Sequence, residues 1–287
     1  MIPARFDYYA PTSLPEVLTL LQQHGPEAKL LAGGHSLIPL MKLRLATPAV
    51  LIDLGRLPSL REIRLEGDVL SIGALCTHAQ IAASSLVRER VPVLAETAGQ
   101  VGDPQVRNRG TIGGSLAHAD PAADYPAVVL ALEAELVAVG PNGQRTIPAT
   151  SFFLAPLTTA LQPDEVLTEV RVPALPARAG SSYAKLENRA SRYAVVGVAA
   201  VLARANGTAE LARIGVTGAG SVAVRAAAAE AALVGKPIDE ATIAAAAELV
   251  PQAVDVVGDL HASAEYRTAM LKVYARRALT AALAAAR

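Results

Sequence analysis

Apolar runs of strand length alternate with amphipathic stretches along the first part of the chain. Residues 29–32 and 49–54 are apolar, and a loop and a helix-like segment separate them. Ser13 is followed three residues later by Glu16, a capping box that predicts a helix ending before Gly25. A strand, a helix and a second strand in this order predict a parallel pair, with the intervening loop at the carboxyl end of the first strand.

The central part of the chain contains alternating hairpin and helix patterns. The turn sequence Pro141-Asn142-Gly143 lies between the segments 135–139 and 144–148 and predicts one of the hairpins. The predicted elements are hairpins 60–65/69–73 and 135–139/144–148, helices 77–84, 91–100 and 125–132, and a strand 165–172.

A stretch rich in proline and alanine, 173–180, predicts a linker. Beyond it the pattern predicts three antiparallel strands, 181–186, 195–203 and 210–217, and alanine-rich helices at 224–234, 239–250 and 264–286. In the last helix Tyr266, Met270, Val273 and Tyr274 recur at helical spacing. We expect this stripe to pack into the core.

Together these elements predict an α+β (mixed α/β) fold with two domains. We expect an N-terminal domain over residues 1–176, divided into two subdomains near residue 55. A C-terminal domain over 177–287 is expected to contain the three-stranded antiparallel sheet and the last helices. A ligand is expected in the crevice between the two domains.

Two glycine pairs are the strongest candidates for a binding site. Gly33-Gly34-His35-Ser36-Leu37 follows a predicted strand, and Gly113-Gly114-Ser115-Leu116 repeats its pattern of two glycines, a polar residue and a leucine. Glycines allow a positive φ and remove side chains that would block a ligand, and successive N–H groups can converge on an anion. A single Gly-Gly pair is more often only a tight turn. The presence of two such loops favours a diphosphate held from both sides, although neither is the G-x-G-x-x-G fingerprint.

The composition excludes several other kinds of site. With 287 residues, 52% hydrophobic and a formal net charge of zero, the chain can form a large core and shows no nucleic-acid footprint. The lone Cys76 allows neither an internal disulfide nor a four-thiolate cluster, and the five histidines lack metal-site spacing. No uncharged apolar run reaches ~18 residues. We therefore expect no metal site in this chain and a cytoplasmic location, with no signal peptide.

The sequence around both loops resembles the FAD-binding flavoproteins of molybdenum hydroxylases, and within them the medium subunits of aerobic carbon monoxide dehydrogenases. The segments that carry the resemblance are 32–39, 41–48, 111–115, 120–126, 185–189 and 193–196, together with the opening 1–8. The resemblance extends over almost the whole chain. Family members often carry asparagine where Ser115 stands, so this chain has one hydrogen-bond donor fewer there.

The resemblance implies a non-covalently bound FAD and a set of residues that hold it. Asp124 is expected on a ribitol or ribose hydroxyl, Lys185 near the flavin and Tyr193 against the isoalloxazine. Their ordinary alternatives are a helix N-cap, a surface lysine and a half-buried strand tyrosine. Some distantly similar flavin oxidases bind flavin covalently at a histidine placed like His35. The full expected set is Ala32, Gly33, Gly34, His35, Ser36, Leu37, Thr111, Ile112, Gly113, Gly114, Ser115, Asp124, Leu161, Lys185 and Tyr193.

The resemblance further implies an electron-transfer subunit rather than a complete enzyme. Electrons would come from 2Fe–2S centres of a small partner subunit, and a large partner subunit would oxidise carbon monoxide with water at molybdenum. A dimer of such heterotrimers would pass electrons to an external acceptor such as a quinone or a cytochrome, with a peripheral place at the inner face of the membrane left open. No catalytic residue is expected in this chain.

Three alternatives remain from the sequence. The chain could be the flavin subunit of another molybdenum hydroxylase that acts on a heterocycle or an aldehyde. It could be a self-sufficient flavin oxidoreductase, or a non-enzymatic nucleotide-binding module of an assembly. The substrate, the final acceptor and the stoichiometry are not determined by the residues themselves.

Overall fold

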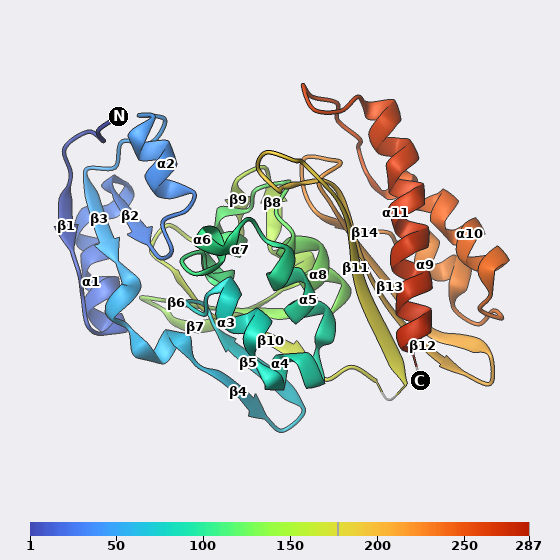
Figure 1. Cartoon of the computed structure of the whole chain (residues 1–287). Helices are drawn as coiled ribbons and strands as arrows, with labels where there is room; N and C mark the ends of the chain where they lie inside the picture. The colour runs from blue at the N-terminus through green and yellow to red at the C-terminus, as the bar shows by residue number, and fades with distance from the viewer. Residues whose placement is uncertain (177, 287) are drawn as a thin grey trace.

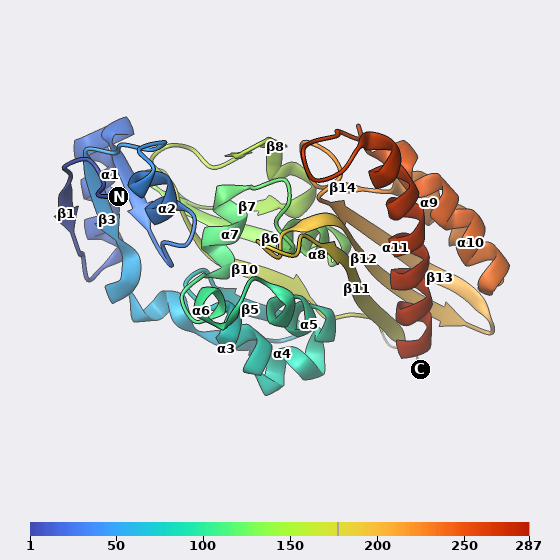
Figure 2. The same ribbon diagram turned by 45° about the horizontal axis from the view of Figure 1, so that its top comes forward.

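The computed structural model describes residues 1–176 and 178–286, which form three main sheets arranged in a row (Figures 1 and 2) and a small two-stranded ribbon. The first sheet is parallel, with the order β1-β3-β2: β1 (Asp7–Tyr9), β2 (Ala28–Leu31) and β3 (Val50–Asp53). The helix α1 (Leu14–His24) buries Val17 and Leu21 in the core of this sheet. The predicted parallel pair is confirmed, because β2 pairs with β3 in parallel register.

The predicted start of α1 is confirmed with one change in its capping. Ser13 Oγ accepts a hydrogen bond from the Glu16 backbone N–H at 3.4 Å. The Glu16 carboxylate reaches back to the N–H of Thr12, at 3.0 Å, instead of that of Ser13. Ser13 therefore caps the helix, and the reciprocal hydrogen bond of the capping box is formed with the residue before Ser13.

The second sheet is antiparallel and carries most of the helices of the middle of the chain. Its order is β4-β5-β10-β6-β7, and both predicted hairpins are present. The short helices at residues 85–90 and 104–107 were not anticipated by the sequence pattern. The strands are β4 (Ile63–Glu66), β5 (Val69–Gly73), β6 (Glu135–Gly140), β7 (Gly143–Pro148) and β10 (Val166–Pro173); the helices are α3 (His78–Ala83), α4 (Ser85–Arg90), α5 (Pro92–Gln100), α6 (Pro104–Arg107), α7 (Ile112–His118) and α8 (Tyr125–Ala131).

The third sheet belongs to the C-terminal part and is packed on both faces. It has the antiparallel order β11-β12-β13-β14, and α9, α10 and α11 lie on the face away from the second sheet (Figure 1). Gly215 on β13 lies so near α8 that a Cβ would be 1.9 Å from Ala127 O. The elements are β11 (Ala179–Glu187), β12 (Ala194–Ala205), β13 (Thr208–Thr217), β14 (Val224–Arg225), α9 (Ala227–Leu233), α10 (Glu240–Leu249) and α11 (Ala264–Ala285).

Two expectations for the C-terminal part were wrong in detail. The three predicted strands are present, but a short fourth strand, β14, replaces the start of the helix predicted at 224–234, because residues 224–225 pair with β13. In α11 the fully buried face is formed by Leu271, Ala275, Ala278, Leu279 and Ala282. Tyr266 and Val273, which were expected in the core, are 48% and 38% exposed. Small alanines face the sheet because they let the helix approach closely, as at Gly180, where a Cβ would be 2.0 Å from Ala282 O.

Shorter elements complete the described residues. They are α2 (Leu37–Lys42), the two-stranded ribbon β8 (Phe153–Ala155) and β9 (Thr158–Thr159), and 3₁₀ turns at Gly25–Glu27, Leu54–Arg56, Pro58–Arg61, Ala149–Ser151 and Val250–Ala253. None of the helices within residues 1–176 and 178–286 combines the length and the hydrophobicity needed to cross a membrane.

Candidate functional site

A cavity of about 590 Å³ lies where the first sheet, the second sheet and the C-terminal part meet. This volume is in the usual range for sites that bind cofactors and other small ligands. Its walls come from the loop after β2, the segment around α7, the β8–β9 ribbon and residues 191–193 before β12. The ligand site expected between the parts of the chain therefore exists as a cavity.

The structure brings most of the residues expected from sequence to the wall of this cavity. Two residues lie behind the wall: Ile112 is fully buried in the core, and Lys185 lies beneath Asp124. The expected residues that line the cavity are Ala32, Gly33, Gly34, His35, Ser36, Leu37, Thr111, Gly113, Gly114, Ser115, Asp124, Leu161 and Tyr193.

The first glycine loop presents unpaired backbone donors. Gly34 has a φ of +79°, which lets the chain turn from β2 into α2. Within the described part of the chain, the N–H groups of Gly34, His35 and Ser36 donate to no protein acceptor. Three successive free donors at the rim of a cavity are suited to an anionic ligand such as a diphosphate.

The second glycine pair requires glycine for a different physical reason, namely close packing. Gly113 and Gly114 lie in the first turn of α7 without a positive φ, so the expected left-handed turn is absent there. A Cβ on Gly113 would lie 2.4 Å from Ala74 Cβ, so this glycine permits close packing of α7 on the second sheet. Gly114 N–H already donates to Thr111 Oγ1 at 3.1 Å. This segment therefore contributes shape and the Ser115 hydroxyl more than free N–H groups.

The two glycine segments touch through their backbones. A Cβ on Gly33 would lie 2.2 Å from Arg109 O and 2.8 Å from Gly110 Cα. Real Cβ atoms do not come so close to backbone atoms, so only glycine allows the first sheet to meet the second sheet at this point. The contact fixes the distance between the two walls of the cavity.

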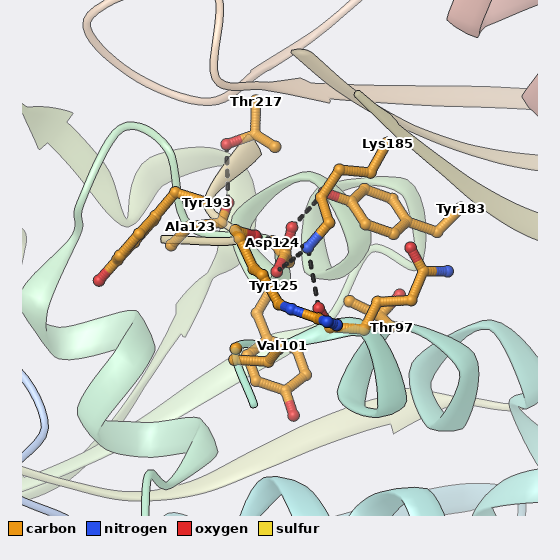
Figure 3. Close-up of polar contacts among 12 residues, drawn as sticks. Thr97, Val101, Ala123, Asp124, Tyr125, Tyr183, Lys185, Tyr193 and Thr217 are labelled. Carbon is orange, nitrogen blue, oxygen red and sulfur yellow. Dashed lines mark hydrogen bonds and ion pairs between the residues drawn. The ribbon is translucent and has the colours of Figure 1, made fainter. Parts of the chain in front are cut away.

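Asp124 is the centre of a buried polar network that joins the N-terminal and C-terminal parts (Figure 3). Its carboxylate accepts hydrogen bonds from Tyr183 Oη at 2.6 Å and Lys185 Nζ at 3.1 Å. Lys185 Nζ also donates to Gln100 O and Arg192 O, both at 2.9 Å. The Asp124 and Lys185 side chains are 4% and 2% exposed. Asp124 stands at the N-cap position of the helix that begins at Tyr125, but its side chain makes no capping hydrogen bond there. Lys185 is buried, so the alternative of a surface lysine is wrong.

The charge state of this network follows from burial and pairing. Burial raises the pKa of Asp124, and the Lys185 ammonium and the Tyr183 hydroxyl offset part of that rise. Burial, together with the negative charge of Asp124, raises the pKa of Tyr183 well above its usual value, so this tyrosine is a firm hydrogen-bond donor. The Asp124 carboxyl is thus held in the wall of the cavity by one ammonium group and one hydroxyl.

Removing the cation should destabilise the chain. We expect Lys185→Met to lower the free energy of unfolding by about 3–5 kcal/mol, because it leaves a buried carboxylate without its partner. Without Lys185 the pKa of Asp124 rises further, so the folded form binds a proton more strongly than the unfolded chain does. The variant should therefore regain stability as the pH falls towards the raised pKa and lose it as the pH rises.

Urea unfolding of the full chain at pH 5 and pH 8 measures this effect. Lys236→Met, which removes an exposed lysine, is the matched control and should change the free energy of unfolding little at either pH. Equal stability of Lys185→Met and the control at pH 8 would contradict the importance of the buried pair.

Tyr193 closes one side of the cavity from a folded loop. The loop is held by hydrogen bonds of 2.8 Å from Asn188 N to Tyr193 O and from Arg192 N to Asn188 O. Lys185 holds the same loop through Arg192 O. Tyr193 is 40% exposed, and burial on its cavity side and the negative charge of Asp120 raise its pKa. The tyrosine thus lies before β12 rather than within a strand.

Sequence reasoning missed several residues of the cavity wall. Asp120 belongs to the 120–126 segment that had already been noted, and His78 lies at the start of the predicted helix 77–84, but neither had a spacing that marked it. The additional lining residues include His78, Val101, Gly102, Val106, Gly110, Asp120, Leu157 and Gln162.

A second cavity of about 300 Å³ adjoins the glycine segments. Its lining includes Arg56, Arg61 and Arg109, with Asp53 as the single carboxylate, and Thr111 belongs to the walls of both cavities. Three guanidinium groups against one carboxylate give this region a net positive charge. Ala32, just before the first glycine pair, also lines both cavities, so this positive charge lies near the first cavity and favours an anion there.

The geometry defines a class of protein: one that binds a phosphate-containing cofactor between three sheets, without the dinucleotide fingerprint. The chain belongs to the flavoproteins of molybdopterin-dependent dehydrogenases. Residues 4–175 match the family described as FAD binding domain in molybdopterin dehydrogenase, and residues 181–282 match the CO dehydrogenase flavoprotein C-terminal domain. The family, the fold class and FAD as the cofactor, all expected from the resemblance, are confirmed.

Known relatives cover the whole chain. The carbon monoxide dehydrogenase medium chain of Hydrogenophaga pseudoflava is 45% identical over 284 residues, 99% of each chain. The 6-hydroxypseudooxynicotine dehydrogenase complex subunit alpha of Paenarthrobacter nicotinovorans is 40% identical over 100% of this chain and 97% of its own. A solved structure of the Hydrogenophaga pseudoflava carbon monoxide dehydrogenase, which lacks the Mo-pyranopterin moiety, matches with a TM-score of 0.98 and 48% identity over all of both chains.

The described residues fit FAD on structural grounds. The cavity combines three free N–H donors, glycines with no room for a Cβ, a buried carboxylate able to accept from a hydroxyl, and apolar wall residues such as Leu161. A dinucleotide with a diphosphate, sugar hydroxyls and aromatic rings needs this combination. The chain is therefore the FAD-binding subunit of an oxidoreductase.

Proposed function

We propose that this chain is the FAD-carrying medium subunit of an aerobic carbon monoxide dehydrogenase. End-to-end similarity at 45% identity to a protein of that name supports the proposal most directly. In the complex, a small subunit with 2Fe–2S centres supplies electrons, and a large molybdenum subunit oxidises carbon monoxide with water to carbon dioxide. An external acceptor such as a quinone or a cytochrome takes the electrons. FAD, when bound, supplies the redox chemistry of this subunit, and the protein supplies its position and electrostatic surroundings.

The residues of the chain have distinct proposed roles towards the cofactor. The N–H groups of the first glycine loop, with Ser36, hold the diphosphate, and the arginine-lined cavity nearby offsets its charge. Asp124 accepts a hydrogen bond from a sugar or ribitol hydroxyl. Tyr193 covers the flavin and excludes water from one side. Lys185, which does not reach the cavity wall, positions Asp124 and the loop that carries Tyr193.

Exposed apolar side chains near the cavity support a partner at its mouth. Leu157 and Tyr193 line the cavity and are 58% and 40% exposed, and Leu43 and Leu45 after α2 are 51% and 73% exposed. Large exposed apolar groups of this kind favour a protein interface. We place the iron–sulfur subunit there, within electron-transfer reach of FAD, in a cytoplasmic dimer of heterotrimers that approaches the inner face of the membrane if its acceptor is a quinone.

The proposed division of the chain places domains at 1–176 and 177–287, with a subdomain boundary near 55. The change from the first to the second sheet between Asp53 and Ile63 supports the inner boundary. The end of one family match at residue 175 and the start of the next at 181 support the outer one.

The second candidate function is the flavin subunit of a dehydrogenase that acts on an N-heterocycle. The 40% identity to the Paenarthrobacter nicotinovorans subunit favours this alternative. Purified native complex should be assayed for dye reduction with carbon monoxide and, separately, with a nicotine-type heterocycle. Reduction with carbon monoxide alone supports the first proposal, and reduction with the heterocycle alone contradicts it.

We expect one FAD per copy of this chain, released by acid. In this proposal the free N–H groups and the walls of the cavity hold the cofactor, and FAD forms no covalent bond to His35. Acid precipitation of the native complex, followed by absorbance of the supernatant and the pellet at flavin wavelengths, measures the partition. Flavin that stays with the polypeptide would instead indicate a covalent bond, and His35→Ala would then release it.

A further inference from the structure

His78 is a buried histidine of the cofactor cavity with no assigned role. It is 4% exposed, is the first residue of α3 and lines the cavity. Its backbone N–H donates to Gly110 O at 3.0 Å, and a Cβ on Gly110 would lie 2.6 Å from His78 Nε2. The absence of a side chain at Gly110 therefore leaves the space in which the imidazole sits. The backbone at Gly110, next to the second glycine segment, thus limits the position of the imidazole on one side.

One ring nitrogen of His78 is paired with a buried tyrosine. His78 Nδ1 and Tyr125 Oη are 3.1 Å apart, and Tyr125 is fully buried at the start of α8. Within the described part of the chain this is the hydrogen bond that the structure gives the Tyr125 hydroxyl. Burial raises the pKa of Tyr125 well above its usual value, so the hydroxyl keeps its hydrogen.

The tautomer of His78 follows from this pairing. If Nδ1 carried the hydrogen, Nδ1 would donate to Tyr125 Oη, and the phenol hydrogen would be buried without an acceptor, which is unfavourable. If Tyr125 Oη donates to Nδ1, both groups are satisfied and the hydrogen of the imidazole is on Nε2. Burial lowers the pKa of His78 to about 4, with a smaller contribution from the positive charges of His35 and Arg107. The ring is therefore neutral near pH 7.

The remaining donor, Nε2–H, requires an acceptor. Among the described residues, Nε2 makes no hydrogen bond. The fully buried polar atoms that lack a hydrogen-bond partner do not include Nε2. It thus keeps accessible surface, and the cavity is the space that His78 lines. We propose that His78 Nε2 donates a hydrogen bond to an acceptor atom of bound FAD, and that Tyr125 fixes the tautomer that makes this possible. The inference rests on the proposed function, since FAD must be the occupant of the cavity.

The tautomer is tested on the full chain without FAD. Long-range ¹⁵N–¹H correlation spectra should show His78 neutral at pH 7 with its hydrogen on Nε2, and the signals are assigned by their loss in His78→Gln. Tyr125→Phe should give a mixture of both tautomers, because the phenol donor is removed. A wild-type spectrum with the hydrogen on Nδ1 would overturn the proposal.

The contact with FAD is tested on the complex after FAD has been removed. We expect His78→Phe to weaken FAD binding about threefold to tenfold, as for the loss of one hydrogen bond. His78→Gln, whose amide nitrogen can replace Nε2, should restore part of the affinity. His261→Phe, at an exposed position, is the control. Equal affinity of wild type and His78→Phe would overturn the proposal while leaving the FAD function intact, whereas a wild-type complex that does not take up FAD would overturn both.

Discussion

Replacing Gly33 by valine is expected to abolish FAD binding. Even the first atom of the new side chain would lie 2.2 Å from Arg109 O and 2.8 Å from Gly110 Cα. Both are backbone atoms, so the clash is relieved only if the first sheet moves away from the second. That movement would displace the first glycine loop, whose free N–H groups face the cavity. Gly33→Ala should already lower flavin content strongly, because the Cβ alone causes the clash.

The matched control is Gly99→Ala in α5, where a Cβ meets nothing within 4 Å. This variant should keep full flavin content, and alanine in a helix should even favour folding slightly. Flavin absorbance per chain in the purified complexes measures the effect, with circular dichroism as a check on the fold. Normal flavin content in both Gly33 variants would contradict the assignment of the first loop to the diphosphate.

A second comparison separates the two glycine segments. At Gly114 a Cβ would meet Thr111 Oγ1 at 2.8 Å, and this hydroxyl caps the helix α7. Gly114→Val should therefore reduce FAD binding through loss of the cap and of room in the cavity, with the chain still folded. Because a side-chain hydroxyl can turn aside more readily than a backbone carbonyl, the loss should be smaller than at Gly33. A larger loss at Gly114 than at Gly33 would reverse the roles that we give to the two segments.

The sequence was sufficient to locate the cavity, because one of the cavity walls is formed by residues that are consecutive in the chain. A strand, two glycines and a helix in succession predict a loop at the carboxyl end of a strand, and the structure has this loop at Gly33 and Gly34. The hairpins and the three C-terminal strands were predictable for the same reason, since a turn and its flanking runs are neighbours in the chain. Their limits changed by a few residues where pairing with other strands extended them.

The rest depends on contacts between residues far apart in the chain, which a single sequence does not reveal. The second glycine pair has the same residue pattern as the first, but its glycines lie within a helix, and Gly113 packs closely against Ala74. Lys185 was expected beside the flavin, yet it turns to Asp124 and to two backbone carbonyls. The His78–Tyr125 pair joins α3 to α8 and has no signature in either segment.

The same long-range contacts join the parts of the chain into one site. Asp124 comes from the N-terminal region, and Tyr183 and Lys185 come from β11 of the C-terminal sheet. Because Lys185 also holds Arg192 O, the position of Tyr193 depends on the same ion pair. The cavity therefore requires both parts of the chain, and we expect neither part to bind FAD when expressed alone.

The full chain expressed alone is expected to show no oxidation of carbon monoxide, even with FAD added. Its one cysteine, Cys76, is buried and cannot supply the four thiolates of a 2Fe–2S centre, so the chain has no relay of its own. Flavin has no ready route of attack on carbon monoxide. In our proposal that oxidation takes place at molybdenum in the large subunit, and the small subunit carries the electrons to FAD.

The measurement is carbon monoxide-dependent dye reduction by three preparations: the chain with FAD, the two partner subunits without the chain, and all three subunits together. Gly33→Val in the complete mixture is the control that keeps every subunit but removes FAD. We expect turnover that passes through flavin only in the complete wild-type mixture, with the flavin absorbance bleaching when carbon monoxide is added. Turnover by the chain alone would overturn the proposed function. Bleaching of the flavin by carbon monoxide in the complete mixture, absent when either partner is omitted, would place this chain at the electron exit of the complex.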